Sequence, residues 1–96
     1  MNISLNETVV QAAGNLASNM NGETVMMRIE SGKYYNLGEI GGRIWSLIET
    51  PITVEALVAE LIQEYEVAAA ECEPQVIAFL ENLAKEQLIL VVQAAS

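Results

Sequence analysis

The spacing of apolar residues changes once along this chain of 96 residues, at about residue 38. Up to about residue 37 the pattern is typical of β-strands, and from about residue 39 to 88 apolar residues recur at helical spacing. Strands and helices that are segregated along a chain are typical of an α+β domain. We therefore expect one domain over residues 1–96, because a chain of this length holds a single core.

The composition is that of a folded domain, since 52% of the residues are apolar. No apolar run reaches the roughly 18 residues needed to span a bilayer. The opening residues lack the basic and apolar parts of a signal peptide. Cys72 is the sole cysteine, which excludes an internal disulfide. We therefore expect a cytoplasmic protein that does not contact a membrane.

Negative charge is concentrated in the second half of the chain. The net charge is −9, and the stretch from Glu49 onward holds nine glutamates against one lysine, Lys85. Such a surface repels phosphate backbones, so we expect no nucleic-acid partner. Two explanations of the charge stay open, a merely solubilising surface or an acidic helical face that attracts a basic partner.

The residues needed for common catalytic sites are missing. The sequence has no histidine and no aspartate, so neither a catalytic triad nor a typical zinc site can be assembled. Carboxylate pairs such as Glu64 and Glu66 are spaced i,i+2, which places them on different helix faces. The glycines of residues 38–42 do not follow a phosphate-binding pattern. We therefore expect no enzymatic activity, no cofactor and no metal.

Two strands joined by a tight turn are predicted in the first half. Glu23–Glu30 alternates, and Lys33–Leu37 follows it after a turn that contains Gly32. An earlier strand at Thr8–Ala12 is expected to complete a three-stranded antiparallel sheet. The two faces of the first predicted strand carry Val25, Met27 and Ile29 on one side and Met26, Arg28 and Glu30 on the other.

The length of the turn decides which face of the hairpin is apolar. A two-residue loop places Tyr35 and Leu37 beside Met26. A three-residue loop, closed by Gly32 in the left-handed region, places them beside Val25. We predict the three-residue loop because it gathers the apolar side chains on one face.

The first predicted helix runs from about Glu39 to Glu49. Gly41 and Gly42 each cost roughly 1 kcal/mol in a helix interior, which indicates that this helix closely approaches the sheet or a neighbouring helix. The expected buried stripe consists of Ile40, Ile44, Leu47 and Ile48, broadened by Trp45.

Two further helices are predicted, one capped by Thr53 and one that begins near Pro74. The apolar residues of the third helix span an arc of roughly 160°, wider than the stripe of an ordinary surface helix. Either this helix is deeply buried, or the part around Val76, Phe79 and Leu83 lines a groove. The stretch Leu88–Val92 is either a short strand or the helix end. The apolar set of the third helix is Val76, Ile77, Phe79, Leu80, Leu83 and Ala84.

The run RIESGKYYNLGEIGGRIWSLIE, followed by TVEALVAELIQEY, resembles the PqqD-like family. Within that family it resembles the stand-alone leader-recognition proteins (RiPP recognition elements) of lasso peptide biosynthesis. The resemblance covers about Val25–Leu90. The chain departs from the pattern at Arg28, where an aspartate is common, and at Gly38, where asparagine often follows the leucine. The matching positions are Gly32, Tyr34, Tyr35, Leu37, Gly42, Ile44, Trp45 and Leu47.

A small sheet followed by three helices indicates a winged helix-turn-helix-like α+β fold, with an N-terminal three-stranded antiparallel sheet. The resemblance implies non-catalytic binding of the leader segment of a ribosomally made precursor peptide. The leader would add as a strand to the third strand, in the cleft with the third helix, and be delivered to a leader peptidase and an ATP-dependent cyclase. The residues implied in peptide binding are Lys33, Tyr34, Tyr35, Asn36, Leu37, Val76, Phe79, Leu80 and Leu83.

Two alternatives to peptide binding stay open, a dimerisation module and a DNA-binding winged helix. In a DNA-binding protein, Pro74–Gln87 would be the recognition helix. Its Lys85 lies between Glu81 and Glu86, so contact with the phosphate backbone would be repulsive.

Overall fold

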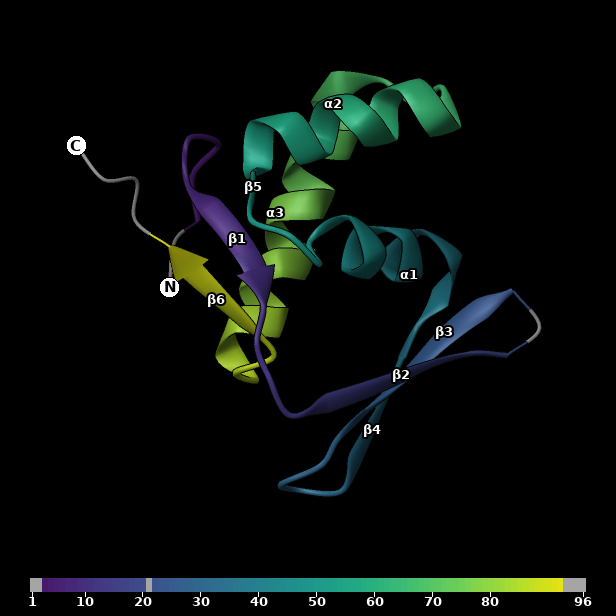
Figure 1. Ribbon diagram of the computed structural model, residues 1–96. Helices are drawn as coiled ribbons and strands as arrows, with labels where there is room; N and C mark the ends of the chain where they lie inside the picture. Colours follow the sequence, from purple (N-terminus) through teal and green to yellow (C-terminus); the bar gives the residue numbers. More distant parts are fainter. Residues whose placement is uncertain (1–2, 21, 93–96) are drawn as a thin grey trace.

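The computed structural model describes residues 3–20 and 22–92 (Figure 1). The ends of the expected domain, residues 1–2 and 93–96, therefore lie outside the described residues. Among the described residues the chain forms three helices and six strands. They are β1 (Thr8–Gln11), β2 (Asn15–Met20), β3 (Glu23–Arg28), β4 (Lys33–Leu37), α1 (Gly38–Leu47), β5 (Ile52–Thr53), α2 (Val54–Tyr65), α3 (Ala69–Lys85) and β6 (Ile89–Val92).

The predicted fold class is confirmed, because a three-stranded antiparallel sheet is followed by three helices. This sheet has the order β2-β3-β4. Its third member is Asn15–Met20, however, and the prediction that Thr8–Ala12 completes it is wrong. The sequence of β2, NLASNM, is half polar and has few typical strand residues, so it does not identify itself as a strand. Its six residues pair along the whole of β3.

The strand at Thr8–Gln11 belongs instead to a second sheet, with the order β5-β1-β6. Val9 pairs with Ile52 on one side and with Val91 on the other, and its side chain is fully buried. The alternative left open for Leu88–Val92 is thereby decided, since Ile89–Val92 is a strand.

In the hairpin of β3 and β4, the residues of β4 share a face with the opposite set of β3 residues from the one predicted. Met26 pairs with Tyr35 and Arg28 with Lys33, so Ile29–Gly32 forms the loop and the predicted three-residue loop is wrong. Gly32 does adopt a left-handed conformation, with φ of 69°. Met26 faces the core, and the polar Arg28 is tolerated on the same face because the end of α3 accepts its hydrogen bonds.

Close packing of α1 against its neighbours explains the two glycines, as predicted. A Cβ atom on Gly42 would lie only 2.7 Å from Cβ of Thr24 on β3, and one on Gly41 would lie 3.0 Å from Cζ of Phe79 on α3. Ile44 is buried as expected, whereas Ile40 is 49% exposed and does not belong to the buried stripe.

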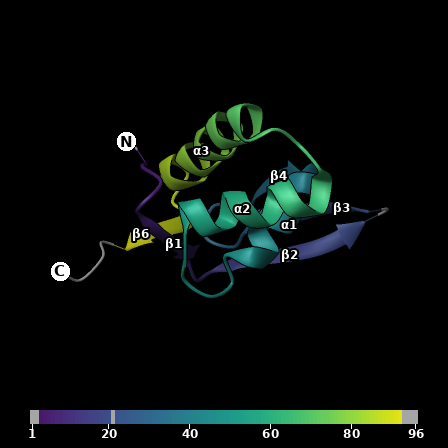
Figure 2. The same ribbon diagram turned by 90° about the horizontal axis from the view of Figure 1, so that it is seen from above.

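The second helix begins as predicted, because Oγ1 of Thr53 accepts a hydrogen bond from the backbone N–H of Ala56 at 3.2 Å. The third helix begins earlier than predicted, at Ala69, and contains Pro74 in its second turn. Pro74 has no backbone N–H, so the carbonyl of Ala70 lacks its usual hydrogen bond within the helix. Ala70 is exposed, so this loss is tolerated. Figure 2 shows α2 and α3 as neighbours.

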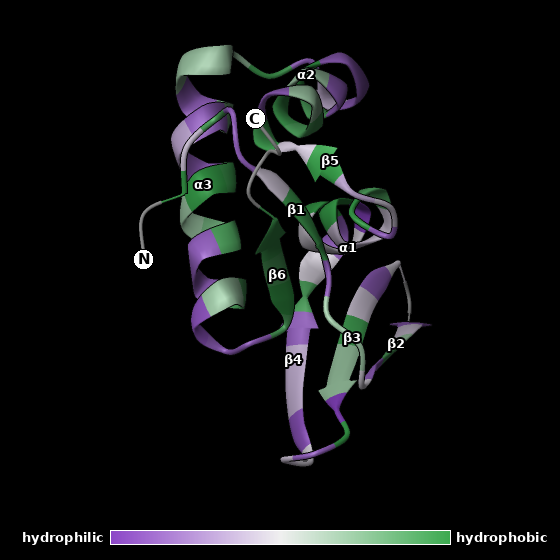
Figure 3. Cartoon of the chain, turned by 60° about the vertical axis from the view of Figure 1, so that its left-hand side comes forward, coloured by the Kyte–Doolittle hydropathy of each residue, from purple (hydrophilic) through white to green (hydrophobic). Residues whose placement is uncertain are grey.

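The core is formed by both sheets and all three helices. Figure 3 shows hydrophobic residues concentrated in β1 and β6, while hydrophobic and hydrophilic residues alternate along α3. In the described part of the chain, no helix is long and apolar enough to cross a membrane. The largest fully buried side chains are those of Val9, Met26, Ile48, Val54, Leu57, Leu61, Leu80 and Leu88.

Candidate functional site

Strand β4 forms one edge of its sheet. It pairs with β3 on one side, and within residues 3–20 and 22–92 no strand pairs with its other side. Lys33, Tyr34 and Asn36 are exposed, whereas Tyr35 and Leu37 are half-buried. The strand therefore presents unpaired backbone donors and acceptors beside partly apolar side chains.

Polar contacts join the hairpin to the C-terminal end of α3. The hydroxyl of Tyr35 donates to Oε1 of Glu86 at 2.9 Å. Nη1 of Arg28 donates to the backbone carbonyl of Glu86 at 2.9 Å, and its Nη2 donates to Oε1 of Gln87 at 3.0 Å. The hydrogen bond to the Glu86 carboxylate, together with partial burial, raises the pKa of Tyr35. These contacts hold β4 at a fixed position relative to α3.

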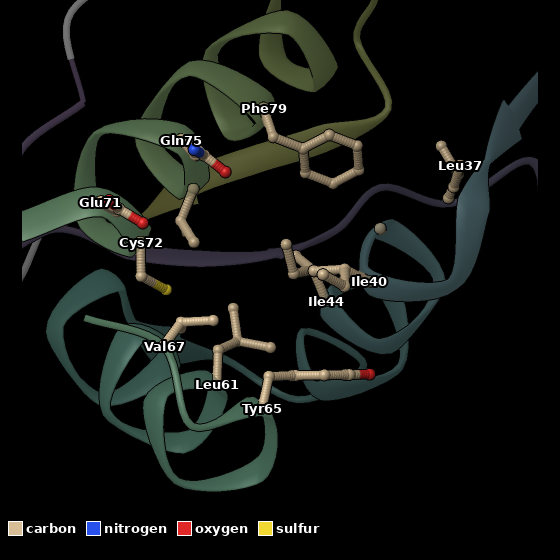
Figure 4. Close-up of a pocket in the computed structure, with 12 residues that line it drawn as sticks. Leu37, Ile40, Ile44, Leu61, Tyr65, Val67, Glu71, Cys72, Gln75 and Phe79 are labelled. Carbon is tan, nitrogen blue, oxygen red and sulfur yellow. The ribbon is translucent and has the colours of Figure 1, made fainter. Parts of the chain in front are cut away.

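An apolar pocket of about 290 Å³ opens at the other end of β4, between the three helices (Figure 4). Its wall is mostly hydrocarbon, and polar groups come from Tyr65, Glu71 and Gln75. Arg43 on α1 and Glu64 on α2 form an ion pair at 2.9 Å that links two of the helices around it. The pocket is lined by Leu37, Ile40, Gly41, Ile44, Leu61, Tyr65, Val67, Glu71, Cys72, Gln75, Val76 and Phe79.

Gly41 and Cys72 shape this pocket without adding charge to it. A Cβ atom on Gly41 would lie 3.1 Å from Cβ of Leu37 as well as close to the Phe79 ring, so glycine leaves room for that ring. Burial raises the pKa of the Cys72 thiol, which keeps this side chain neutral. The pocket wall is therefore suited to apolar groups.

The structure brings together most of the residues that the sequence analysis assigned to peptide binding. The predicted residues of β4 form the open edge, and Leu37, Val76 and Phe79 line the pocket. Leu80 and Leu83 are almost fully buried in the core and do not line the pocket.

Several pocket residues were missed by the sequence analysis. Glu71 and Cys72 were missed because the third helix was predicted to begin near Pro74, whereas α3 begins at Ala69. The three alanines at residues 68–70 favour a helix and could have indicated this earlier start. Ile40 was assigned to the core, although it lines the pocket. Val67 follows α2 and carried no periodic signal.

The described residues offer no obvious metal site. Among residues 3–20 and 22–92, no three Cys or Glu side chains gather closely enough to hold a metal ion.

An open strand edge beside an apolar pocket defines the class of modules that accept an extended peptide. The chain belongs to the PqqD family, since residues 23–89 match the family described as coenzyme PQQ synthesis protein D (PqqD). This match confirms the resemblance to the PqqD-like family that was drawn from the hairpin residues and the segment around Trp45. A comparison with curated proteins finds no match.

Two solved structures are similar to this chain. TbiB1, in complex with the TbiA(beta) leader peptide, is 28% identical, with a TM-score of 0.75 over 91% of this chain and 99% of TbiB1. Lasso peptide synthetase B1, complexed with the leader peptide, is 17% identical, with a TM-score of 0.68 over 85% of this chain and 96% of that protein. The second likeness establishes the fold alone.

Proposed function

We propose that this protein binds the leader segment of a ribosomally synthesised precursor peptide, as a lasso-peptide recognition element. The leader adds as an antiparallel or parallel strand to β4, in the cleft between β4 and α3. The observation that carries this proposal is the outer edge of β4, with which no strand of the described residues pairs and which leads into an apolar pocket at Leu37. The leader-peptide complex of TbiB1, which is 28% identical, supports it.

The two parts of the site have different roles in the proposed complex. Backbone groups of Lys33–Leu37 supply hydrogen bonds that are independent of the leader's sequence. The pocket supplies selectivity, because it accepts an apolar side chain of the leader against Phe79, Val76 and Leu37. Its volume of about 290 Å³ is at the lower limit of small-molecule sites, which suits one or two side chains better than a cofactor.

The proposed role is binding without catalysis. The sequence contains no histidine and a single cysteine, and that thiol is buried with a raised pKa. The protein would deliver the bound precursor to a leader peptidase and an ATP-dependent cyclase. We place this step in the cytoplasm, where a lone thiol such as Cys72 stays reduced. We treat residues 1–96 as one peptide-recognition domain.

Amide hydrogen exchange tests the proposed binding mode. On addition of a synthetic leader peptide, amides within Lys33–Leu37 should gain protection on alternate residues, because alternate amides point to the open edge. Strand β2, the other edge of the same sheet, is the internal control and should be unchanged. Saturable leader binding without new protection in β4 would contradict strand addition there.

A parallel titration with duplex DNA addresses the alternative function. The third helix carries Glu71, Glu73 and Glu81 as well as Lys85, so we expect no binding to the duplex at physiological salt. DNA binding tighter than leader binding would overturn the proposal.

A further inference from the structure

The hairpin of β3 and β4 is attached to the helices at its two ends in different ways. At one end, β4 leads into α1 at Gly38, and α1 packs closely against Thr24 of β3. In Figures 1 and 3 the other end of the hairpin extends away from α1. Strands rise about 3.4 Å per residue, so Lys33 lies roughly 14 Å from Leu37 along β4. The position of this far end therefore depends on contacts other than those with α1.

Arg28, which pairs with Lys33 at the far end, makes such contacts with the C-terminal end of α3. Its Nη1 donates to the backbone carbonyl of Glu86 at 2.9 Å, and its Nη2 donates to Oε1 of Gln87 at 3.0 Å. The Arg28 side chain is 22% exposed, whereas Glu30, its ion-pair partner at 3.4 Å, is 84% exposed. An exposed ion pair contributes little, so the two bonds to α3 are the contacts that fix the guanidinium.

The backbone at the end of α3 leaves an acceptor for this guanidinium. The two N–H groups that follow Glu86 donate to the carbonyls of Ala84 and Leu83 at 3.0 and 2.9 Å, which is the Schellman pattern of a helix end. The carbonyl of Glu86 lies beyond these bonds and accepts from Arg28. A cation at this place also interacts favourably with the negative end of the helix dipole.

Gln87 has a backbone conformation that favours glycine. Its φ angle is 61°, in the left-handed region, and glycine is the usual residue at this position after a helix. Glutamine is strained there, but its side chain accepts the second hydrogen bond from Arg28. Glycine would relax the turn and lose that bond. The strained residue therefore favours a role for the contact between the hairpin and α3 beyond ending the helix.

We infer that Arg28 is a positioning residue for leader binding, which holds β4 and α3 at the separation that the leader requires. Strand β4 lies between β3 and the open edge, so Arg28 acts through the position of β4 and not by contact with the leader. Rotation of the hairpin by about 10° at its attachment to α1 would move the far end by roughly 2.4 Å, enough to break a hydrogen bond to the leader. This inference rests on the proposed function, because it explains how the leader site is kept ready.

Substitutions at the two ends of one hydrogen bond separate positioning from stability. Arg28→Met keeps much of the apolar stem and removes both donors. Gln87→Gly removes an acceptor but relaxes the helix end, so its stability should at least equal that of wild type. The matched control is Lys85→Met, which removes a positive charge from the last turn of α3 and leaves the bonds to the hairpin in place. Urea denaturation measures stability, and stopped-flow anisotropy with a labelled synthetic leader peptide measures both rate constants of binding.

Arg28→Met should raise the dissociation constant about tenfold, as expected if the hairpin then spends about a tenth of its time in the position that accepts the leader. The loss should lie in the association rate, whereas loss of a direct contact would lie in the dissociation rate. Gln87→Gly should weaken binding about threefold at undiminished stability. Arg28→Lys should bind with an affinity between those of wild type and Arg28→Met, because an ammonium can still reach one acceptor. Lys85→Met should bind as wild type.

Wild-type affinity in Arg28→Met would overturn the inference. So would wild-type affinity in Gln87→Gly, since leader binding would then follow stability, or Arg28 would contact the leader directly. An equal loss in Lys85→Met would assign the effect to charge at the helix end and not to the hydrogen bonds. If the wild-type protein does not bind the leader peptide, the proposed function fails, whereas normal wild-type binding with unaffected variants refutes the positioning role alone.

Discussion

Phe79 is the residue whose substitution best separates a binding role from a structural one. Its ring is half-buried, lines the pocket and lies against the space that Gly41 leaves open. Phe79→Ala enlarges the pocket and removes the aromatic surface on which a leader side chain would pack. An aromatic anchor at an interface is typically worth about 2 kcal/mol, which corresponds to a loss of about thirtyfold in leader affinity.

The same substitution has a smaller effect on folding. Replacing a fully buried Phe by Ala costs about 3–5 kcal/mol, and because Phe79 is only partly buried we expect about 1–3 kcal/mol. A domain of this size has a free energy of unfolding of about 5–14 kcal/mol, so the variant should remain folded. Urea denaturation measures the stability, and fluorescence anisotropy with a labelled leader measures the dissociation constant.

The matched control is Leu57→Ala on α2. Leu57 is fully buried and does not line the pocket, so this variant should lose about 2–5 kcal/mol of stability while its folded fraction binds the leader normally. If Phe79→Ala also binds within twofold of wild type, Phe79 is a core residue and the anchor role is refuted. The role would then pass to Val76 and Leu37.

Three further predictions follow from the site. Asn36→Pro should weaken leader binding if the Asn36 amide faces the open edge, because proline removes that donor. Gain of exchange protection by the wild-type Asn36 amide on leader binding shows that it faces the edge. If that amide is protected but Asn36→Pro binds the leader with unchanged affinity, strand addition is contradicted. Gly41→Ala should lower leader affinity several-fold at nearly unchanged stability, since the added methyl displaces the Phe79 ring while alanine favours the helix; equal affinity would argue against the pocket. Incubated alone with precursor and ATP, the protein should leave the peptide's mass unchanged, and a cleaved or cyclised product would contradict a non-catalytic role.

The pH dependence of stability gives a test of the contact between β4 and α3. The pKa of Tyr35 is raised in the folded state by its hydrogen bond to Glu86, so the bond's contribution is fully present below the unfolded pKa of about 10. The contribution is lost as pH rises through the raised pKa. Wild type should therefore lose more stability than Tyr35→Phe between pH 9 and pH 11, and equal losses would contradict the bond.

The sequence predicted the elements whose signals are local. The threonine cap of α2, the glycine turn before β4 and the close approach of α1 are each encoded within a few residues, and all three are present. The start of α3 was misplaced because Pro74 is a common first-turn residue, while the alanines before it are the stronger helix signal.

Pairing between distant segments was not predictable in the same way. Strand β1 lies between Ile52–Thr53 and Ile89–Val92, and neither partner is near it in the sequence. The pairing of β3 with β4 was predicted wrongly for a different reason. Both faces of β3 carry apolar residues, so the apolar pattern alone does not identify the buried face. Val25 and Met27 were expected in the core, yet Met26 is the buried residue. The residues of the candidate site that belong to the family motif could be predicted from the sequence. Val67 and Cys72, which form part of the pocket wall, could be identified only from the three-dimensional fold.

An open edge strand is also a liability, because it can template pairing with any extended chain. In this protein the open edge is kept short. Strand β4 is five residues long, and it is bounded by Gly32 and Gly38, whose φ angles of 69° and 73° turn the backbone away at both ends. The side chain of Asn36 accepts a hydrogen bond from the N–H of Gly38 at 2.9 Å, which fixes the second turn. In the proposed complex, the five residues of this edge pair with one short segment of the leader, and the two glycine turns limit how far the pairing can extend.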